Sequence, residues 1–261
     1  MRPDYKNWVP KGMLYGFGGG AIAAAVLMAV FAVALPAGVL KAALMGIAGA
    51  AAAVLLVAAV WLLHLHNAFS YEGKRKLSKT IVEGVAAYVT IPEGGRCLDV
   101  GCGSGALTIA CARRSPGAAV LGVDRWGKEY ASYSRGLCER NARAEGVSNV
   151  AFRQGDALRL DFPDESFDAV VSNYVYHNIA GADKQGCLRE TLRVLKKGGV
   201  FALHDIMTPA RYGDMQAFVE ELKAAGYEKV ELIDTADGMF LEKKEALWLD
   251  LAGSALLTGI K

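Results

Sequence analysis

The chain has 261 residues, a net charge of +2 and a hydrophobic content of 53%, with a mean hydropathy of +0.23. This near-neutral charge gives no reason to expect a nucleic-acid partner. The five cysteines form neither a CxxC pair nor a metal-like cluster with the four histidines, so we expect reduced cytosolic thiols and no bound metal.

Two long uncharged segments, residues 13–35 and 42–63, account for the apolar excess. Each reaches the ~20 residues that a helix needs to cross about 30 Å of hydrocarbon. Pro36 and Gly38 lie between the two segments and break helices. The pattern predicts a transmembrane helical hairpin over residues 1–66. A cleaved signal peptide has a shorter apolar core, and a buried hairpin of a soluble protein rarely contains two uncharged runs of this length.

The charges that flank the hairpin predict its orientation. Cations prefer the cytoplasmic side of a membrane, and only Lys41 lies at the turn. The other cations precede the first span or follow the second: Arg2, Lys6, Lys11, Lys74, Arg75, Lys76 and Lys79. We therefore expect a two-span membrane protein whose N-terminus and remaining chain are cytoplasmic.

Small residues in both spans allow a close approach of the two helices. Gly16 with Gly20, and Gly46 with Ala50, have the spacing of small-residue packing motifs. Alanine-rich helices also contain such pairs by chance, so both interpretations stay open. Residues 67–95 follow as an amphipathic linker, with a helix over residues 73–89 that ends at "IPEGG".

A strand, a glycine-rich loop and a helix follow from residue 96, with the sequences "RCLDV", "GCGSG" and "ALTIACARR". Gly101, Gly103 and Gly105 let the backbone turn sharply and approach a ligand closely. The next helix presents its N-terminus to that ligand. The same residues also satisfy the GxGxxA form of a dinucleotide-binding fingerprint.

Three acidic residues favour a different nucleoside ligand. Asp99 precedes the first glycine by two residues, where a carboxylate suits a cationic ammonium group and repels a pyrophosphate. Asp124 ends a second strand, "VLGVD", where it can accept hydrogen bonds from two ribose hydroxyls. Asp156 follows a third strand in "FRQGDAL", within reach of an adenine amino group. Capping of turns is the alternative role for Asp124 and Asp156.

Taken in order, D-x-G-x-G-x-G, the acid after the second strand, "GDA" and "FDAVVSNYVYHNI" resemble the motifs of class I S-adenosylmethionine (SAM)-dependent methyltransferases. The resemblance covers about residues 79–261 and implies SAM as the cofactor. The implied contacts are Asp99, Gly101 and Gly103 with the methionine part, Asp124 with the ribose, Arg125 and Trp126 beside the adenine, Asp156 and Ala157 with its edge, and Asn173 with the amino-acid end. Gly105 completes the cofactor-binding set.

Alternating strands and helices predict a parallel sheet with helices on both faces. The family implies a seventh, antiparallel strand, which "SALLTGI" fits unless the tail from Leu247 is an interfacial helix. The expected fold is α/β, a doubly wound seven-stranded Rossmann-like methyltransferase sheet over residues 96–261, preceded by the two-helix transmembrane hairpin. The expected strands are 96–100, 119–124, 150–154, 167–172, 200–205, one in "KVELIDT" and 254–260. The expected helices between them are 105–114, 128–145, 183–195 and 212–225, with "LKKGG" as a helix end and turn.

Candidate proton acceptors follow the fourth and fifth strands. Tyr174, Tyr176 and His177 lie in "NYVYHNI", and Asp205 lies beside His204 in "LHDIM". An unperturbed histidine titrates near neutral pH, so His177 is the preferred base, although it can also merely pack there. Packing is favoured for His204, which lies inside a strand.

These features predict a membrane-anchored SAM-dependent methyltransferase that acts on a lipophilic small molecule such as a quinone precursor, a lipid or a hydrophobic thiol. Apolar residues near the expected opening of the site favour a lipophilic acceptor: Ile206, Met207, Met239 and Phe240. The alternatives are detoxifying methylation of a thiol, metalloid or xenobiotic, a non-catalytic SAM-binding scaffold, and a nicotinamide-dependent enzyme. The sequence indicates no oligomeric state.

Overall fold

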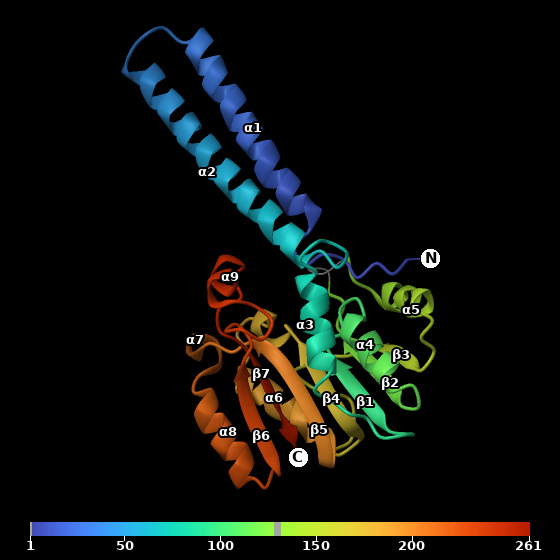
Figure 1. Cartoon of the computed structure of the whole chain (residues 1–261). Helices are drawn as coiled ribbons and strands as arrows, with labels where there is room; N and C mark the ends of the chain where they lie inside the picture. The colour runs from blue at the N-terminus through green and yellow to red at the C-terminus, as the bar shows by residue number, and fades with distance from the viewer. Residues whose placement is uncertain (1, 128–131) are drawn as a thin grey trace. The chain divides into compact units, whose positions relative to one another are not determined.

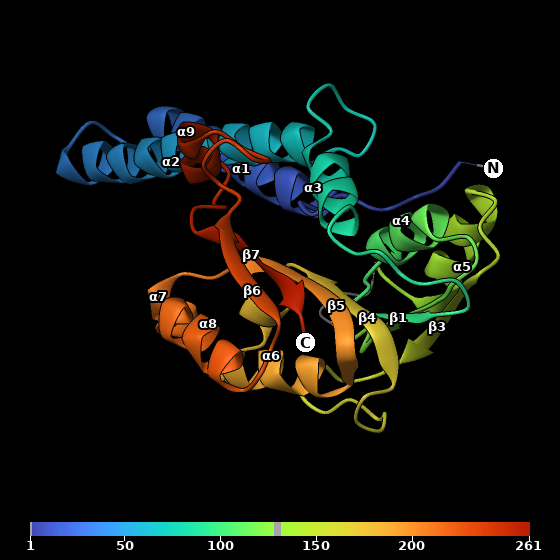
Figure 2. The ribbon, with the colours of Figure 1, turned by 60° about the horizontal axis from the view of Figure 1, so that its bottom comes forward.

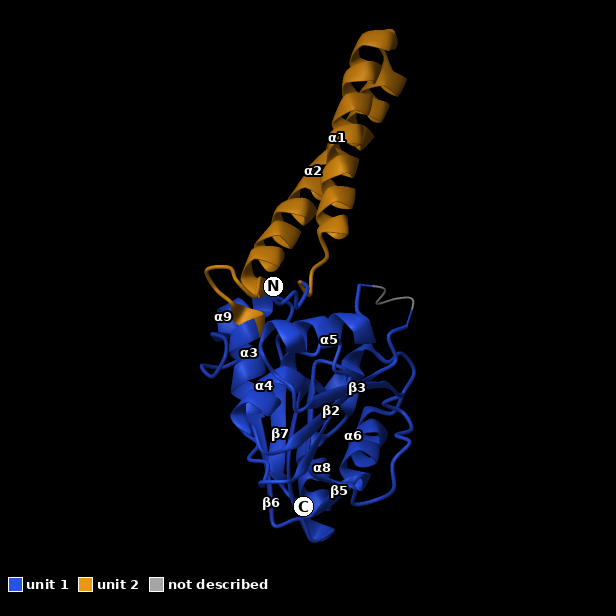
Figure 3. Ribbon diagram, turned by 90° about the vertical axis from the view of Figure 1, so that its right-hand side faces the viewer, with its two compact units in different colours: residues 1–6, 79–261 blue, residues 7–78 orange. Residues whose placement is uncertain are grey.

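The structure, a computed structural model, describes residues 2–127 and 132–261. The chain divides into two compact units (Figure 3). One unit holds residues 7–78. The other joins residues 1–6 to residues 79–261, so a short N-terminal segment belongs with the second, larger unit.

The smaller unit is a helical hairpin of α1 (Lys11–Ala34) and α2 (Val39–Phe69) (Figure 1). The expected break at Pro36 and Gly38 is confirmed. The Lys41 ammonium donates hydrogen bonds to the carbonyls of Ala32 and Leu35 at the end of α1. The lysine at the turn therefore satisfies carbonyls that a helix end leaves without an intrahelical partner.

The two helices approach each other closely at Gly20 and Gly49. A Cβ atom added at Gly20 would lie 3.3 Å from Cδ1 of Leu55, and one at Gly49 would lie 3.2 Å from the sulfur of Met28. The positions of a Cβ at Gly16 and Gly46 have no such neighbour within 4 Å. Only part of the expected small-residue pattern therefore lies at the helix contact.

The larger unit is built on a seven-stranded sheet with the order β3-β2-β1-β4-β5-β7-β6. Every neighbouring pair is parallel except those of β7, which is antiparallel to both β5 and β6. The strands are β1 (Arg96–Val100), β2 (Ala119–Asp124), β3 (Val150–Gln154), β4 (Phe167–Asn173), β5 (Leu195–Ile206), β6 (Lys229–Asp234) and β7 (Ser254–Ile260). The expected seven-stranded methyltransferase sheet is confirmed, including an antiparallel strand at 254–260.

Helices cover both faces of this sheet (Figure 2). One face carries α3 (Leu77–Ala86), α4 (Ala106–Arg114) and α5 (Arg135–Ala144). The other carries α6 (Lys184–Arg193), α7 (Pro209–Tyr212) and α8 (Met215–Ala224), while α9 (Lys243–Trp248) lies in the connection between β6 and β7. The arrangement follows from the right-handed βαβ crossovers, because the side that their helices cover changes where the strand order reverses, between β1 and β4.

Two expectations about local structure were wrong. The segment "LKKGG" is not a helix end and turn but the first part of β5, with Leu195 paired to Phe167 and an irregular register before Val200. The expected helix over residues 212–225 is instead two helices, because Gly213 and Asp214 separate α7 from α8. Of the helix expected over residues 128–145, α5 begins at Arg135, and residues 128–131 lie outside the described residues.

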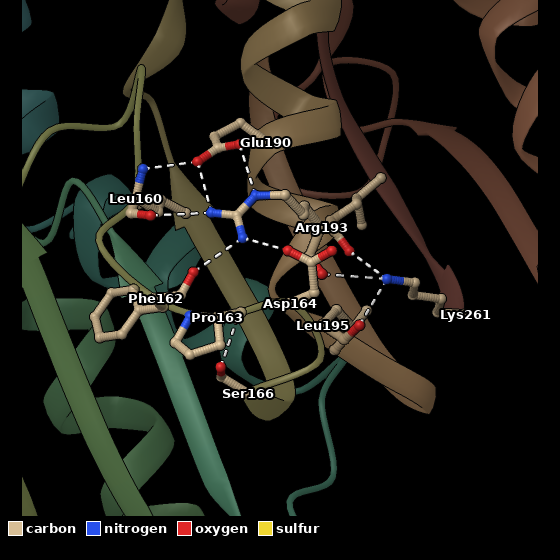
Figure 4. A network of polar contacts seen from close by, with 10 residues as sticks. Leu160, Phe162, Pro163, Asp164, Ser166, Glu190, Arg193, Leu195 and Lys261 are labelled. Atoms are coloured by element: carbon tan, nitrogen blue, oxygen red, sulfur yellow. Dashed lines mark hydrogen bonds and ion pairs between the residues drawn. The ribbon is translucent and has the colours of Figure 1, made fainter.

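Arg193 at the end of α6 binds the connection between β3 and β4 to that helix (Figure 4). Its guanidinium donates to both carboxylate oxygens of Glu190 at 2.9 Å and to Asp164 at 2.6 Å. It also donates to the carbonyls of Leu160 and Phe162 at 2.9 Å each. These carboxylates raise the pKa of Arg193 above its ordinary value, because they stabilise the charged form.

Replacement of Arg193 by alanine is expected to lower stability by about 2–4 kcal/mol, which is roughly 5–12 °C in Tm. The reason is that two carboxylates and two carbonyls lose their donor at once. Arg189→Ala is the matched control, because its ion pair with Glu221 is 42% and 51% exposed and exposed pairs contribute at most about 1 kcal/mol. Thermal unfolding of the three proteins in one detergent measures the difference; equal losses would contradict this role of Arg193.

Candidate active site

The carboxyl ends of the parallel strands bring the expected site residues to one edge of the sheet. Asp124 ends β2, Asn173 ends β4, and Asp205 is the last residue but one of β5. The strand order reverses between β1 and β4, which are neighbours in the sheet. Such a switch point is where doubly wound sheets bind ligands.

The glycine loop after β1 turns through left-handed backbone conformations. Gly101 has φ 75° and Gly103 has φ 54°, which side chains disfavour. A Cβ at Gly101 would lie 2.3 Å from Val175, so the segment after β4 packs directly on the loop. At Gly103 nothing lies within 4 Å of that position. The loop therefore offers open backbone at Gly103, with the post-β4 segment beside it.

Asp124 holds this loop from the end of β2. One carboxylate oxygen accepts the backbone N–H of Gly103 at 2.8 Å, and the other accepts that of Trp126 at 2.8 Å. The Trp126 indole N–H in turn donates to the Gly103 carbonyl at 3.0 Å. Trp126 has φ 44°, a conformation that non-glycine residues adopt rarely. Each carboxylate oxygen has a second lone pair, so Asp124 can still accept bonds from a ligand.

Asp99 lies beneath the loop rather than on its surface. The residue is 1% exposed, and its carboxylate accepts the hydroxyl of Thr108 in α4 at 2.6 Å. Burial raises the pKa of Asp99 to about 7, although the Thr108 hydrogen bonds oppose the shift, and the nearby charge of Asp124 adds to it. A direct contact with an ammonium group stays a prediction.

Asp99→Asn is expected to change the pH dependence of stability. The folded pKa of about 7 lies above the ordinary 3.8, so the carboxyl stabilises the fold while protonated, and this contribution is lost progressively as the pH rises from 3.8 to about 7. Asparagine stays neutral. The stability of Asp99→Asn relative to the wild type is therefore expected to rise by about 1–3 kcal/mol between pH 5 and pH 8. Thermal unfolding across that range measures it, and parallel pH profiles would contradict it.

The residues expected around the adenine lie at the ends of β2 and β3. Asp156 is exposed, and one of its carboxylate oxygens accepts the backbone N–H of Leu158 at 2.9 Å, so it does cap its own turn. Ala157 is half-buried, and Arg125 is exposed. The Arg125 carbonyl accepts a hydrogen bond from Gln154 at 3.3 Å. Contact of these residues with an adenine stays a prediction.

His177 and Asp205 form a close pair at the ends of β4 and β5. His177 is in the short 3₁₀ turn Tyr176–Asn178, and its Nδ1 lies 2.5 Å from a carboxylate oxygen of Asp205. Burial alone would raise the pKa of Asp205, but hydrogen bonds from the His177 ring and the Ile206 N–H outweigh it and lower that pKa. An ionised carboxylate only accepts, so Nδ1 carries the proton and Nε2 is left as a base.

Asn173, His204 and Thr235 form a second, buried chain of hydrogen bonds. Burial lowers the pKa of His204 to about 3, so its ring is neutral. Its Nδ1 lies 2.7 Å from the Asn173 side-chain oxygen, and its Nε2 lies 2.8 Å from the Thr235 hydroxyl. His204 is therefore a structural residue that fixes Asn173, as the packing interpretation predicts.

Tyr174 lies between the two histidines. Its ring contacts His204 edge-on at 4.6 Å between centroids and His177 at 6.0 Å. Its hydroxyl lies 2.8 Å from that of Ser254 at the start of β7, and burial raises the pKa of the phenol above its ordinary value. Tyr174 also has φ 55°, a strained conformation that occurs often at functional sites. Because its phenol stays neutral, Tyr174 is better suited to position the methyl acceptor than to take a proton from it.

Some expected residues are not brought into the site. Tyr176 is fully buried in the core, and its hydroxyl lies 2.8 Å from that of Thr191 in α6. It therefore does not reach the sheet edge as a base. Among the apolar residues expected at the mouth, only Met239 is exposed. The others pack in the interior: Ile206, Met207 and Phe240.

The structure adds residues that sequence reasoning missed. Thr108, Thr235 and Ser254 each hydrogen-bond a predicted site residue or its direct support. Their sequence signal is weak, since isolated hydroxyl residues occur throughout the chain. Only the position of Ser254 at the start of an expected strand, next to the sheet edge, could have indicated it.

This strand-end arrangement has a counterpart among known protein families. A family model described as a methyltransferase domain matches residues 91–250. The chain belongs to the class I SAM-dependent methyltransferases. The match covers the glycine loop, Asp124, and both the post-β4 and post-β5 segments, so the family explains why these residues share one edge.

Several methyltransferases are similar to this chain in sequence. The demethylmenaquinone methyltransferase of Thermus thermophilus is 36% identical over 116 residues, which are 44% of this methyltransferase and 49% of that relative. The sterol 24-C-methyltransferase of Aspergillus fumigatus is 35% identical over 132 residues, 50% of this chain and 33% of the relative. The chain thus spans about half the length, or less, of these curated relatives.

Solved structures confirm the fold. The (4+2)-cyclase SpnF superposes with a TM-score of 0.52 and 23% identity, over 70% of this methyltransferase and 81% of that chain. A SAM-dependent methyltransferase from Aquifex aeolicus has a TM-score of 0.50 and 17% identity, over 72% and 93%. At this identity the similarity concerns the fold alone.

The residues present fit SAM, which is the cofactor of this family. Gly103 leaves open space where a side chain would stand, and Asp124 has acceptor capacity beside it. We expect the loop backbone to hold the amino-acid part and Asp124 to hold the ribose. The cofactor-binding roles of the individual residues stay predictions.

Proposed function

We propose that this methyltransferase is anchored in a membrane by α1 and α2 and methylates a lipophilic small molecule that partitions into the bilayer. The observation that carries the proposal is the presence of two bilayer-length apolar helices in the same chain as the SAM fold. A tethered enzyme meets a membrane-dissolved acceptor at a much higher local concentration than a soluble enzyme does.

The exposure of the hairpin supports membrane insertion. Only 11% of the most apolar 18-residue window of α1 is buried, and only 6% of that of α2. Val33 and Val39, near the turn, are 90% and 88% exposed. A core hairpin of a soluble protein would bury such residues. The cations that precede the first span and follow the second favour a cytoplasmic N-terminus and a cytoplasmic catalytic unit. SAM is available on that side of the membrane.

The relatives support a lipophilic acceptor. Methyltransferases named for demethylmenaquinone and for a sterol are among the similar sequences, so an isoprenoid naphthoquinol that lacks its ring methyl group is the first acceptor to test. An arsenite methyltransferase from Aquipseudomonas alcaligenes is similar too. All five cysteines of this chain, which lie within the described residues, are buried. The described residues therefore contain no exposed thiol that could bind a metalloid. For this reason we prefer the lipophilic acceptor.

The proposed chemistry divides between cofactor and protein. Bound SAM supplies a methyl group that its positive sulfur has already activated. The protein positions the acceptor in line with that group, an effect worth on the order of 7–11 kcal/mol. His177 takes the proton of an acidic hydroxyl or carbon at Nε2, while Asp205 holds the ring and stabilises the resulting imidazolium.

Methyl transfer between and within vesicles tests the proposal. The full chain is reconstituted in phosphatidylcholine vesicles with methyl-labelled SAM outside. The demethylated naphthoquinol is placed either in the same vesicles or in separate, protein-free ones. We expect labelled quinol in the same-vesicle sample and at least about tenfold less in the other. Equal rates in both samples would contradict the proposal.

A further inference from the structure

The N-terminal segment, residues 2–6, packs on the catalytic unit although it precedes the hairpin in sequence. Its anchor is Tyr5, which is 7% exposed and whose hydroxyl donates to Glu145 at 3.2 Å. Glu145 lies at the end of α5 and also pairs with Arg113 of α4 at 3.0 Å. The segment is therefore part of the same folded unit as the SAM loop.

Asn141 of α5 links this segment to the glycine loop. Its side-chain oxygen accepts the backbone N–H of Asp4 at 2.7 Å, and its amide group donates to the Asp4 carbonyl at 3.0 Å. The same amide group donates to the carbonyl of Ser104 at 3.0 Å. Asn141 is 1% exposed. Both of its N–H bonds are thus used, one on the N-terminal segment and one on the cofactor loop.

Ser104 follows Gly103 in the loop, and other side chains hold the backbone of Gly103. Asp124, Trp126 and Cys138 hold Gly103 through its N–H and its carbonyl. Asn141, which lies three residues after Cys138 in α5, holds the next residue, Ser104. Without that donor the buried Ser104 carbonyl loses a partner, which costs about 1–3 kcal/mol and favours a rearranged loop.

We propose that Asn141 is a positioning residue for SAM, and that the backbone of Asp4 is its structural partner. The N-terminal segment then acts as a strap: its docking orients the Asn141 amide, and the amide holds the loop in the shape that receives the cofactor. The inference concerns cofactor affinity and is independent of the acceptor and of membrane insertion.

Four variants of the full chain test the proposal through the Kd for SAM, measured by isothermal titration in detergent. Asn141→Ala removes the amide. Asp4→Pro removes the backbone N–H that Asn141 accepts. Asp4→Ala keeps that N–H and removes the carboxylate, which accepts two hydrogen bonds from Lys6 and interacts with the charge of Arg140. We expect the first two to raise the Kd by about 5- to 30-fold, and Asp4→Ala to stay within about twofold.

Asn149→Ala is the control for a general loss of stability. Its amide group donates to three carbonyls around the end of α4, those of Ala112, Ser115 and Ala118. Within the described residues, this amide group forms no hydrogen bond with the glycine loop. We expect a lower Tm with an unchanged Kd. If Asn141→Ala does not fold, the comparison of the SAM Kd of Asp4→Pro with that of Asp4→Ala tests the proposal alone. Wild-type affinity in Asn141→Ala and Asp4→Pro, or equal weakening by Asp4→Ala and Asp4→Pro, would overturn the proposal.

Discussion

Asp124→Ala is expected to weaken SAM binding by about 100-fold or more. The change removes both acceptors that hold Gly103 and Trp126, together with the expected partner of the ribose hydroxyls. Two ribose hydroxyls are expected to donate to the Asp124 carboxylate. Hydrogen bonds to a charged group are worth about 1.5–3 kcal/mol each, so the loss of these two bonds to the ribose accounts for this factor. Isothermal titration with SAM and with S-adenosylhomocysteine measures the effect.

Asp234→Ala is the matched control for this experiment. Asp234 also ends a strand, β6, and accepts the N–H of the residue two positions on, Ala236, at 2.8 Å. It lies at the far side of the sheet from β1 and β2, so its removal is expected to leave the Kd within about twofold. A folded Asp124→Ala protein that binds SAM within about threefold of the wild type contradicts the assigned role.

His177→Ala is expected to lower kcat by about 10²- to 10⁴-fold with an acceptor that must lose a proton. The SAM Kd should stay within about twofold, because His177 contacts Asp205 and Tyr174 rather than the glycine loop. This split between kcat and Kd separates a proton acceptor from a residue that only supports the fold. Initial rates at saturating SAM, in vesicles that contain the acceptor, measure it.

Asn178→Ala controls for disturbance of the same turn. Asn178 is exposed, and its amide donates to the Tyr174 carbonyl at 3.2 Å. We expect it to retain at least about half of kcat. A comparable fall in both variants, or unchanged activity of His177→Ala, would mean that the turn matters only as structure.

The sheet could be predicted because its strands carry strong local signals. The bounds of β1, β2 and β3 agree with the structure, since each is a short segment with apolar residues that ends beside a turn residue: β1 before Gly101, β2 at Asp124 and β3 before Gly155. The start of β5 was missed for a physical reason. Locally "LKKGG" has the residues of a turn, but Leu195 pairs with Phe167, and Lys261 donates to the Leu195 carbonyl at 2.7 Å. Such long-range contacts override local preference.

The sequence predicts which residues lie at the site but not which of them contact one another. The rule for parallel sheets places Asp124, Asn173 and Asp205 at one edge. It cannot say that His177 faces Asp205 while Tyr176, one residue earlier, turns into the core. That difference depends on the 3₁₀ turn. The contact between Asp4 and Asn141 spans 137 residues, so no local pattern reports it.

A structure of the full chain with S-adenosylhomocysteine tests the central claim most directly, namely that the ends of β1, β2 and β4 form the cofactor site. We predict the ribose hydroxyls within hydrogen-bond distance of the Asp124 carboxylate, and the amino-acid part along the backbone at Gly103. A nucleoside bound away from these strand ends, with Asp124 still facing only protein, would contradict the account.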